Sequence, residues 1–129
     1  MKVWTDLGAS GWSEWSGWEV GLGGPADWSA RWIGPHEPHR PPAGRRPAHL
    51  LRRPFVVETD VSRARLYATA HGVYEVFLNG NRVGDLELAP GSTAYRAHLD
   101  VQTYDVTALL QRGDNVLGVV VSDGWWRGK

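Results

Sequence analysis

The chain has 129 residues, which is long enough for one domain with a sizeable core. Its 14 basic and 14 acidic side chains balance, so no surplus of positive charge points to a nucleic-acid or anionic-membrane partner. It contains no cysteine, which excludes disulfides and thiolate metal sites, and no apolar run approaches the roughly 20 residues of a membrane span.

The first part of the chain is rich in tryptophan, glycine and serine, and six of the eight tryptophans fall between Trp4 and Trp32. Residues 12–16 have the Trp-Ser-x-Trp-Ser pattern of cytokine receptors and thrombospondin repeats, where indoles stack with arginines. Those families depend on cysteines, so an aromatic-rich strand is the favoured interpretation here. Residues 1–6 contain no apolar signal-peptide segment, which leaves the compartment open while favouring the cytoplasm.

A proline-rich segment follows, with five prolines between residues 35 and 48, and it predicts a linker or long loop. Residues 36–39, His-Glu-Pro-His, contain metal-ligand types. The flanking prolines disfavour the helix that would aim both histidines at one ion, and no third ligand is evident. We therefore expect a polar loop, with no metal and no cofactor.

From residue 49 onward, alternating apolar and polar residues predict short strands. The first is expected over 50–58, where Pro54 indicates an edge strand or a bulge. The second is expected over 63–71, with its alternate apolar residues on one face, namely Ala64, Leu66, Ala68 and Ala70. The third covers 73–78, and the following Asn79-Gly80 pair predicts a type I′ hairpin turn with a return strand from Asn81.

Further short elements are expected after this hairpin. Residues 89–92 form a predicted turn, and 97–104 a predicted strand. One helical turn is expected over 105–110, with Asp105 or Thr107 as its N-cap and Gly113 ending it. The run 115–122 is apolar on both faces, which is typical of a buried strand. No pattern indicates a helix longer than about two turns, so the fold class is all-β.

The motifs from Ala64 to Gly128, in this order and spacing, resemble the N-terminal region of bacterial α-L-rhamnosidases, glycoside hydrolase family 78. The pieces that carry the resemblance are Ala64-Arg65-Leu66-Tyr67, Gly72-Val73-Tyr74-Glu75, Leu78-Asn79-Gly80-Asn81-Arg82-Val83-Gly84, Leu88-Ala89-Pro90-Gly91, Tyr95, Gln102-Thr103-Tyr104-Asp105-Val106-Thr107, Gly113-Asp114-Asn115-Val116-Leu117-Gly118 and Asp123-Gly124-Trp125-Trp126-Arg127-Gly128. The resemblance continues upstream through Trp15-Ser16, Glu19-Val20-Gly21-Leu22 and Pro25-Ala26-Asp27-Trp28.

The resemblance implies a division into three parts. Residues 49–129 would form a galactose-binding-like (jelly-roll) β-sandwich that is incomplete at its C-terminus. Residues 23–48 would be a linker, and 1–22 the last hairpin of a fibronectin-type-III-like domain. A sandwich that lacks its last strands would leave the strand at 116–121 beside an unpaired edge, and such edges favour aggregation.

The function that the resemblance implies is that of a multidomain enzyme, which removes terminal α-L-rhamnose with inversion. An inverting glycosidase needs two carboxyl groups roughly 6.5–9.5 Å apart. In this family they lie in a downstream (α/α)6 barrel, so no catalytic residue carries over and the fragment alone is not expected to be catalytic. The implied partners are a rhamnose-containing carbohydrate and the barrel. A free-standing carbohydrate-binding module, or a structural sandwich that braces another domain, is the alternative.

The candidate carbohydrate-binding residues are Asp123, Trp125, Trp126 and Arg127. Flat indole faces suit the apolar face of a sugar, while the neighbouring charged groups can hydrogen-bond hydroxyls. The competing interpretation is that one indole packs in the core and the other contacts the barrel.

Overall fold

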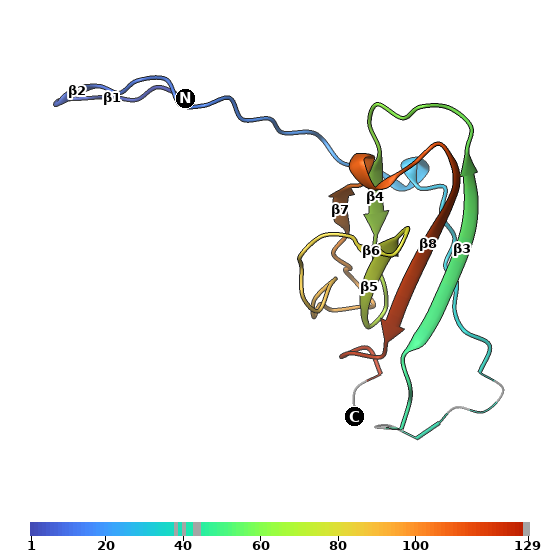
Figure 1. Cartoon of the computed structure of the whole chain (residues 1–129). Coiled ribbons are helices and arrows are strands. Elements are labelled where there is room, and N and C mark those ends of the chain that lie inside the picture. Colours follow the sequence, from blue (N-terminus) through green and yellow to red (C-terminus); the bar gives the residue numbers. More distant parts are fainter. Residues whose placement is uncertain (38, 40, 43–44, 128–129) are drawn as a thin grey trace. The chain divides into compact units, whose positions relative to one another are not determined.

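The computed structural model describes residues 1–37, 39, 41–42 and 45–127 (Figure 1). The chain divides into two compact units, Met1–Trp32 and Ile33–Lys129. The described residues form antiparallel strands and two short 3-10 turns, so the all-β prediction is confirmed. Within this part of the chain, no helix has the length and apolar character needed to cross a membrane.

The first unit contains one small hairpin, in which β1 (Trp4–Thr5) pairs antiparallel with β2 (Gly8–Ala9). A single 3-10 turn, η1, follows at Pro25–Asp27. The strand expected at the Trp-Ser-x-Trp-Ser motif is wrong, because residues 12–16 are exposed and belong to none of the described strands. Their backbone makes one contact with the start of the chain, where the Ser13 N–H donates to the Met1 carbonyl at 2.8 Å. Assignment of residues 1–22 to a fibronectin-like domain stays a prediction.

The larger sheet of the second unit has the order β3-β8-β5-β6 (Figure 1). It consists of β3 (His49–Val57), β8 (Gly113–Ser122), β5 (Val73–Leu78) and β6 (Asn81–Arg82). Pro54 lies in β3, which is an edge strand as its sequence predicts. The expectation that the strand at 116–121 borders an unpaired edge is wrong, because β8 pairs with both β3 and β5.

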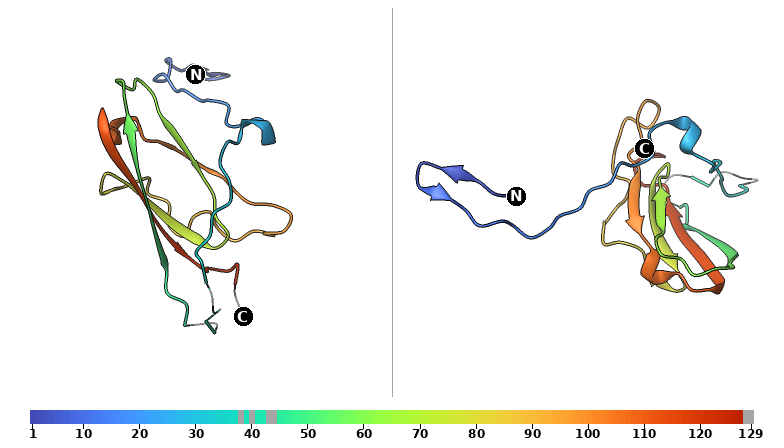
Figure 2. Two further views of the ribbon diagram at one scale, coloured as in Figure 1. Left: turned by 90° about the vertical axis from the view of Figure 1, so that its right-hand side faces the viewer. Right: turned by 90° about the horizontal axis from the view of Figure 1, so that it is seen from above.

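The smaller sheet pairs β4 (Arg65–Ala68) with β7 (Gln102–Asp105). The two sheets, shown from two further directions in Figure 2, contribute side chains to one core. Its centre is made of Tyr74, Val76, Leu78, Val83, Ala89 and Val106. The four residues expected to share a face, Ala64, Leu66, Ala68 and Ala70, all pack against this core, which confirms that prediction.

Strand β8 packs against the core with one face only, and its apolar side chains on both faces are half-buried. Leu117, Val119 and Val121 pack against the core. Val116 and Val120 point to the other face, where they remain half-buried beside the exposed Leu50 of β3. The expectation of a strand buried on both faces is therefore wrong for the outer face.

The hairpin after β5 confirms the predicted type I′ turn, since Asn79 and Gly80 have φ values of 52° and 84°. The turn expected over 89–92 is present, and the Gly91 N–H donates to the Leu88 carbonyl at 2.9 Å. The strand expected over 97–104 starts only at Gln102, because residues 94–98 turn back on themselves. There the N–H groups of residues 97 and 98 both donate to the Ala94 carbonyl, at 2.6 and 2.9 Å.

The predicted helical turn is the 3-10 turn η2, Thr107–Leu109. The N-cap residue is Val106, so the expectation of Asp105 or Thr107 at that position is wrong. Asp105 lies one residue earlier, and its Oδ1 accepts a hydrogen bond from the Thr107 N–H at 3.0 Å. Hydrogen bonds from Thr107, together with the charge of Arg65, lower the pKa of the Asp105 carboxyl. Gly113 does not end this turn as expected, since it has φ 94° and begins β8.

Candidate functional site

The predicted site residues follow β8 in a turn over 123–127, closed by the Trp126 N–H, which donates to the Asp123 carbonyl at 3.0 Å. This turn lies directly against the start of β5. A Cβ added to Gly72 would stand 2.1 Å from the Ser122 carbonyl oxygen, and one added to Gly124 would stand 2.9 Å from Val73 Cγ1. Two glycines therefore permit the close approach that fixes the turn on the sheet. Gly128 lies outside the described residues.

An aromatic cluster forms around Trp126. Its indole stacks on the His71 ring, with centroids 4.1 Å apart and an interplanar angle of 13°. Tyr95 meets the same indole edge-on at 5.5 Å and 70°. Such offset-stacked and T-shaped pairs are the geometries that aromatic rings prefer. Trp126 is therefore held in place by two rings, and the residue remains 37% exposed.

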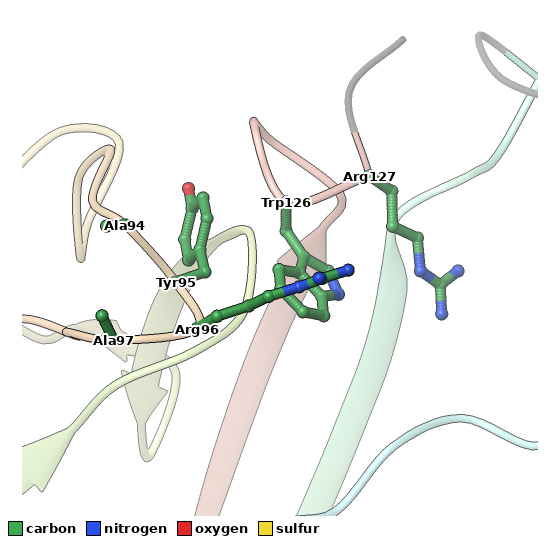
Figure 3. Close-up of a pocket in the computed structure, with 6 residues that line it drawn as sticks. All are labelled: Ala94, Tyr95, Arg96, Ala97, Trp126 and Arg127. Carbon is green, nitrogen blue, oxygen red and sulfur yellow. The ribbon is translucent and has the colours of Figure 1, made fainter.

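Beside this cluster the surface forms an open depression of about 520 Å³ (Figure 3). It is lined by the 94–97 turn and by the end of the chain, through Ala94, Tyr95, Arg96, Ala97, Trp126 and Arg127. Trp125 is 49% exposed and is not among the lining residues. The structure thus brings one of the two predicted indoles, and not the other, to this depression.

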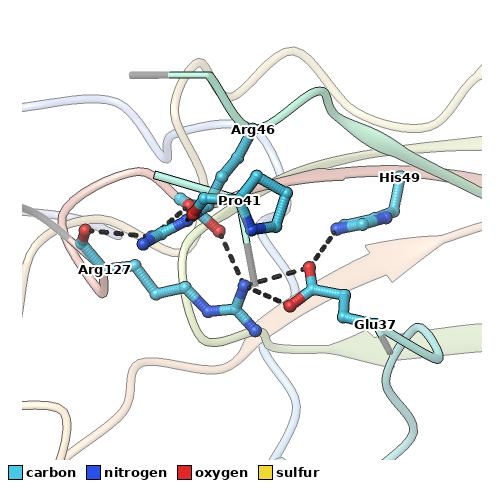
Figure 4. A network of polar contacts seen from close by, with 6 residues as sticks. Glu37, Pro41, Arg46, His49 and Arg127 are labelled. Carbon is cyan, nitrogen blue, oxygen red and sulfur yellow. Dashed lines mark hydrogen bonds and ion pairs between the residues drawn. The ribbon is translucent and has the colours of Figure 1, made fainter. Parts of the chain in front are cut away.

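The predicted charged residues belong to a network of polar contacts that we call the clamp, formed by Glu37, Arg46, His49, Asp123 and Arg127 (Figure 4). Arg46 Nη1 donates to Asp123 Oδ2 at 2.9 Å. Arg127 Nη1 donates to both oxygens of Glu37, at 2.9 and 3.0 Å. His49 Nε2 lies 3.0 Å from Glu37 Oε1.

The clamp ties the proline-rich segment to the turn that carries Trp126. Its side chains are only 11 to 26% exposed, so these contacts are more sheltered from solvent than ordinary surface pairs. The hydrogen bond and charge of Arg127, with a smaller effect of His49, lower the pKa of the Glu37 carboxyl. A carboxylate held ionised in this way is a poor general acid, because it has no proton to give near neutral pH.

The clamp also changes what Asp123 and Arg127 can offer a ligand. Both side chains already have ion-pair partners, and Arg127 points away from the depression in Figure 3. A sugar hydroxyl would have to share them. Their role in binding remains a prediction. The structure adds Tyr95, Arg96 and His71 around Trp126. None of these was among the predicted binding residues, although Tyr95 is one of the residues that carry the resemblance.

Metal-ligating side chains do not gather anywhere in the described residues, where no group of three or more His, Asp or Glu could hold an ion. In the His-Glu-Pro-His segment, Pro38 lies outside the described residues, and Glu37 is bound to Arg127 and His49. The described residues at this end of the sandwich bring together aromatic rings and guanidinium groups.

Comparison with protein families matches residues 59–129 to the family described as the "Alpha-L-rhamnosidase N-terminal domain". The chain is 40% identical, over its whole length, to an "Alpha-L-rhamnosidase" of Formosa agariphila. It is 52% identical, over 63% of its length, to one of Streptomyces avermitilis. The chain spans only 15% and 8% of these two relatives.

Solved structures of α-L-rhamnosidases are also similar to this chain. The Streptomyces avermitilis α-L-rhamnosidase complexed with L-rhamnose is similar over 64% of this chain and 8% of its own, with a TM-score of 0.62 and 52% identity. The native enzyme from Aspergillus terreus is similar over 62% of this chain and 9% of its own, with a TM-score of 0.61 and 45% identity.

Proposed function

Because the chain belongs to the family of α-L-rhamnosidase N-terminal domains, we propose that it is the non-catalytic accessory sandwich of an α-L-rhamnosidase. The whole enzyme would hydrolyse terminal α-L-rhamnose with inversion, using an (α/α)6 barrel outside these 129 residues. The family match over residues 59–129 is the observation that carries this proposal. The clamp supports the non-catalytic part of this proposal, because the carboxylates of Glu37 and Asp123 are already paired with Arg127 and Arg46.

The accessory role predicts that the sandwich can replace its counterpart in a relative. Residues 49–127 would be grafted into the Streptomyces avermitilis enzyme in place of the matching segment. We expect the chimera to hydrolyse an aryl α-L-rhamnoside within about tenfold of the parent rate, which is less than about 1.4 kcal/mol in the barrier. The isolated chain should show no turnover above a heat-inactivated sample.

Two controls make this test decisive. A version of the relative without the segment reports whether the barrel needs a sandwich at all, and circular dichroism with size-exclusion chromatography reports whether the chimera folds. A folded chimera that is inactive would contradict the accessory role. Hydrolysis by the isolated chain would contradict its non-catalytic character.

A second candidate function is carbohydrate binding, and the depression at Trp126 and Tyr95 is the observation that favours it. In this proposal a rhamnose-containing carbohydrate lies against Trp126, and Asp123 and Arg127 are further candidate contacts, whereas Trp125 does not line the depression and is not expected to contribute. A few polar groups beside an aromatic surface are the usual composition of a small-molecule site. The competing proposal is that Trp126 serves only to pack against His71 and that Trp125 contacts the barrel.

The two tryptophans form a matched pair for testing this second function. L-Rhamnose would be titrated into the chain while protein NMR spectra are recorded, with an expected dissociation constant in the millimolar range, or about −4 kcal/mol. Trp126→Ala should abolish the response, because it removes the ring that lines the depression. Trp125→Ala should change the dissociation constant by less than about twofold, which is within about 0.4 kcal/mol. Equal responses in both variants and the wild type would exclude this location.

A further inference from the structure

Arg96 is a charged group without a partner at the depression. Its side chain is exposed and makes no ion pair or hydrogen bond within the part of the chain that the structure describes. The other arginine of the lining, Arg127, has its charge balanced by Glu37. Arg96 therefore gives the depression an uncompensated positive charge, and no carboxylate lies among the lining residues.

The loop that presents Arg96 is fixed by its own hydrogen bonds. The Ala94 carbonyl accepts from two backbone N–H groups at 2.6 and 2.9 Å, and Thr93 Oγ1 donates to the His98 carbonyl at 2.8 Å. The Tyr95 hydroxyl donates to the Gly91 carbonyl at 3.3 Å. Because the loop is already ordered, little entropy remains to be lost when a ligand binds between it and Trp126.

The chemistry of the lining selects a particular class of ligand. One face of the Trp126 indole is covered by His71, and Tyr95 meets the indole at 70°. The remaining indole surface suits the flat apolar face of a pyranose ring. A guanidinium only donates hydrogen bonds, and its planar array of donors matches an oxyanion such as a carboxylate or sulfate. Ala94 and Ala97 are small, and a volume of about 520 Å³ lies within the usual range for small-molecule sites.

We propose that this depression binds an acidic sugar, with the pyranose ring against Trp126 and its carboxylate or sulfate group at Arg96. The inference rests on the proposed carbohydrate-binding role of the chain and names a ligand class for it. A neutral sugar would offer Arg96 only hydroxyl oxygens as acceptors. An acidic sugar would offer an oxyanion, which adds the attraction between opposite charges and can accept two parallel hydrogen bonds from the guanidinium.

The test compares sugars that differ only at C6, where the group is a carboxylate, a hydroxymethyl or a sulfate ester. Methyl β-D-glucuronide, methyl β-D-glucoside and its 6-sulfate are titrated separately into the full chain at low salt, with protein NMR as the readout. We expect millimolar binding of the glucuronide or the 6-sulfate, or of both, at least fivefold tighter than that of the glucoside. Arg96→Gln should remove this preference. Arg112→Gln, which changes an exposed arginine before β8, at the other end of that strand, should preserve it.

Salt provides a second measurement that does not depend on a variant. Raising the ionic strength should weaken binding of the acidic sugars towards that of the glucoside, because the Arg96 contact is exposed. Any of four results would overturn the inference. Two concern affinity: equal affinity for charged and neutral sugars, or no binding of any sugar. The others are an unchanged preference in Arg96→Gln and the same spectral shifts with acetate or sulfate alone. The chimera with the Streptomyces avermitilis enzyme tests the accessory role separately. If the chimera is active and the sugar titration fails, the acidic-sugar proposal is wrong and the accessory role stands.

Discussion

Replacing Asn115 with alanine is expected to lower the free energy of unfolding of the sandwich unit by about 3 kcal/mol. Asn115 is 1% exposed and is the one buried polar residue among those the structure describes. Its Oδ1 accepts from Asn79 Nδ2 at 2.8 Å and from the Gln111 N–H at 3.0 Å. Its Nδ2 donates to the carbonyls of Gln111 and Gly113, at 2.7 and 2.9 Å. Alanine would leave these partners without the amide, and of them Asn79 and Gly113 are half-buried while Gln111 is exposed.

The size of the effect follows from the number of groups left unpaired. A buried donor or acceptor without a partner costs about 1–3 kcal/mol, and the half-buried amide of Asn79 and carbonyl of Gly113 would lose their bonds to Asn115 together. Urea unfolding followed by circular dichroism measures the change. Asn81→Ala is the matched control, because Asn81 is exposed and makes a single long bond of 3.4 Å to the Asn79 carbonyl. A midpoint for Asn115→Ala equal to that of the control would show that the amide network does not stabilise the fold.

The elements that could be predicted from the sequence are those determined locally. The hairpin of β5 and β6 could be predicted from apolar and polar residues that alternate over 73–78 and from the Asn79-Gly80 pair that follows. These signals are sufficient because the turn and both strands are contiguous in the chain. Pro54 marked β3 as an edge strand for the same reason, since a missing backbone donor is a property of one residue.

The misplaced features depend on pairing between distant segments. Nothing in the run 115–122 reveals that β3 will occupy the far side of β8, so the expected free edge was wrong. The strand expected from residue 97 fails because the Ala94 carbonyl captures two N–H groups that a strand would have used for pairing. An alternating pattern describes one segment only. It does not indicate whether that segment forms a local turn or pairs with a strand that is distant in the sequence.

The site was predicted only in part for the same physical reason. Trp126 was found because it stands in a recognisable motif, but its ring partners His71 and Tyr95 come from separate loops. Glu37 and Arg46 lie in a proline-rich segment whose composition indicates a linker, yet both contact the turn at 123–127. The boundaries proposed for that linker, 23–48, remain a prediction. An ion pair across such a sequence separation leaves no periodic signal to detect.

The position on which both the sheet and the site depend is Gly72, and Gly72→Ala is expected to destabilise the unit by about 3 kcal/mol. Gly72 has φ 104°, a conformation that residues with a side chain rarely adopt. An added Cβ would also stand 2.1 Å from the Ser122 carbonyl oxygen, which belongs to the backbone and cannot rotate away. The end of β8 must then separate from the start of β5.

Gly80→Ala separates these two causes. Gly80 also has a positive φ, 84°, but a Cβ there meets nothing within 4 Å, so this variant should lose only about 1 kcal/mol from backbone strain. The difference between the two midpoints in urea measures the close approach itself. Because His71 precedes Gly72 and stacks on Trp126, Gly72→Ala should also change the tryptophan fluorescence before global unfolding, whereas Gly80→Ala should not. Equal losses of stability in the two variants, with unchanged fluorescence in both, would mean that the contact between β5 and the 123–127 turn does not hold Trp126 in place.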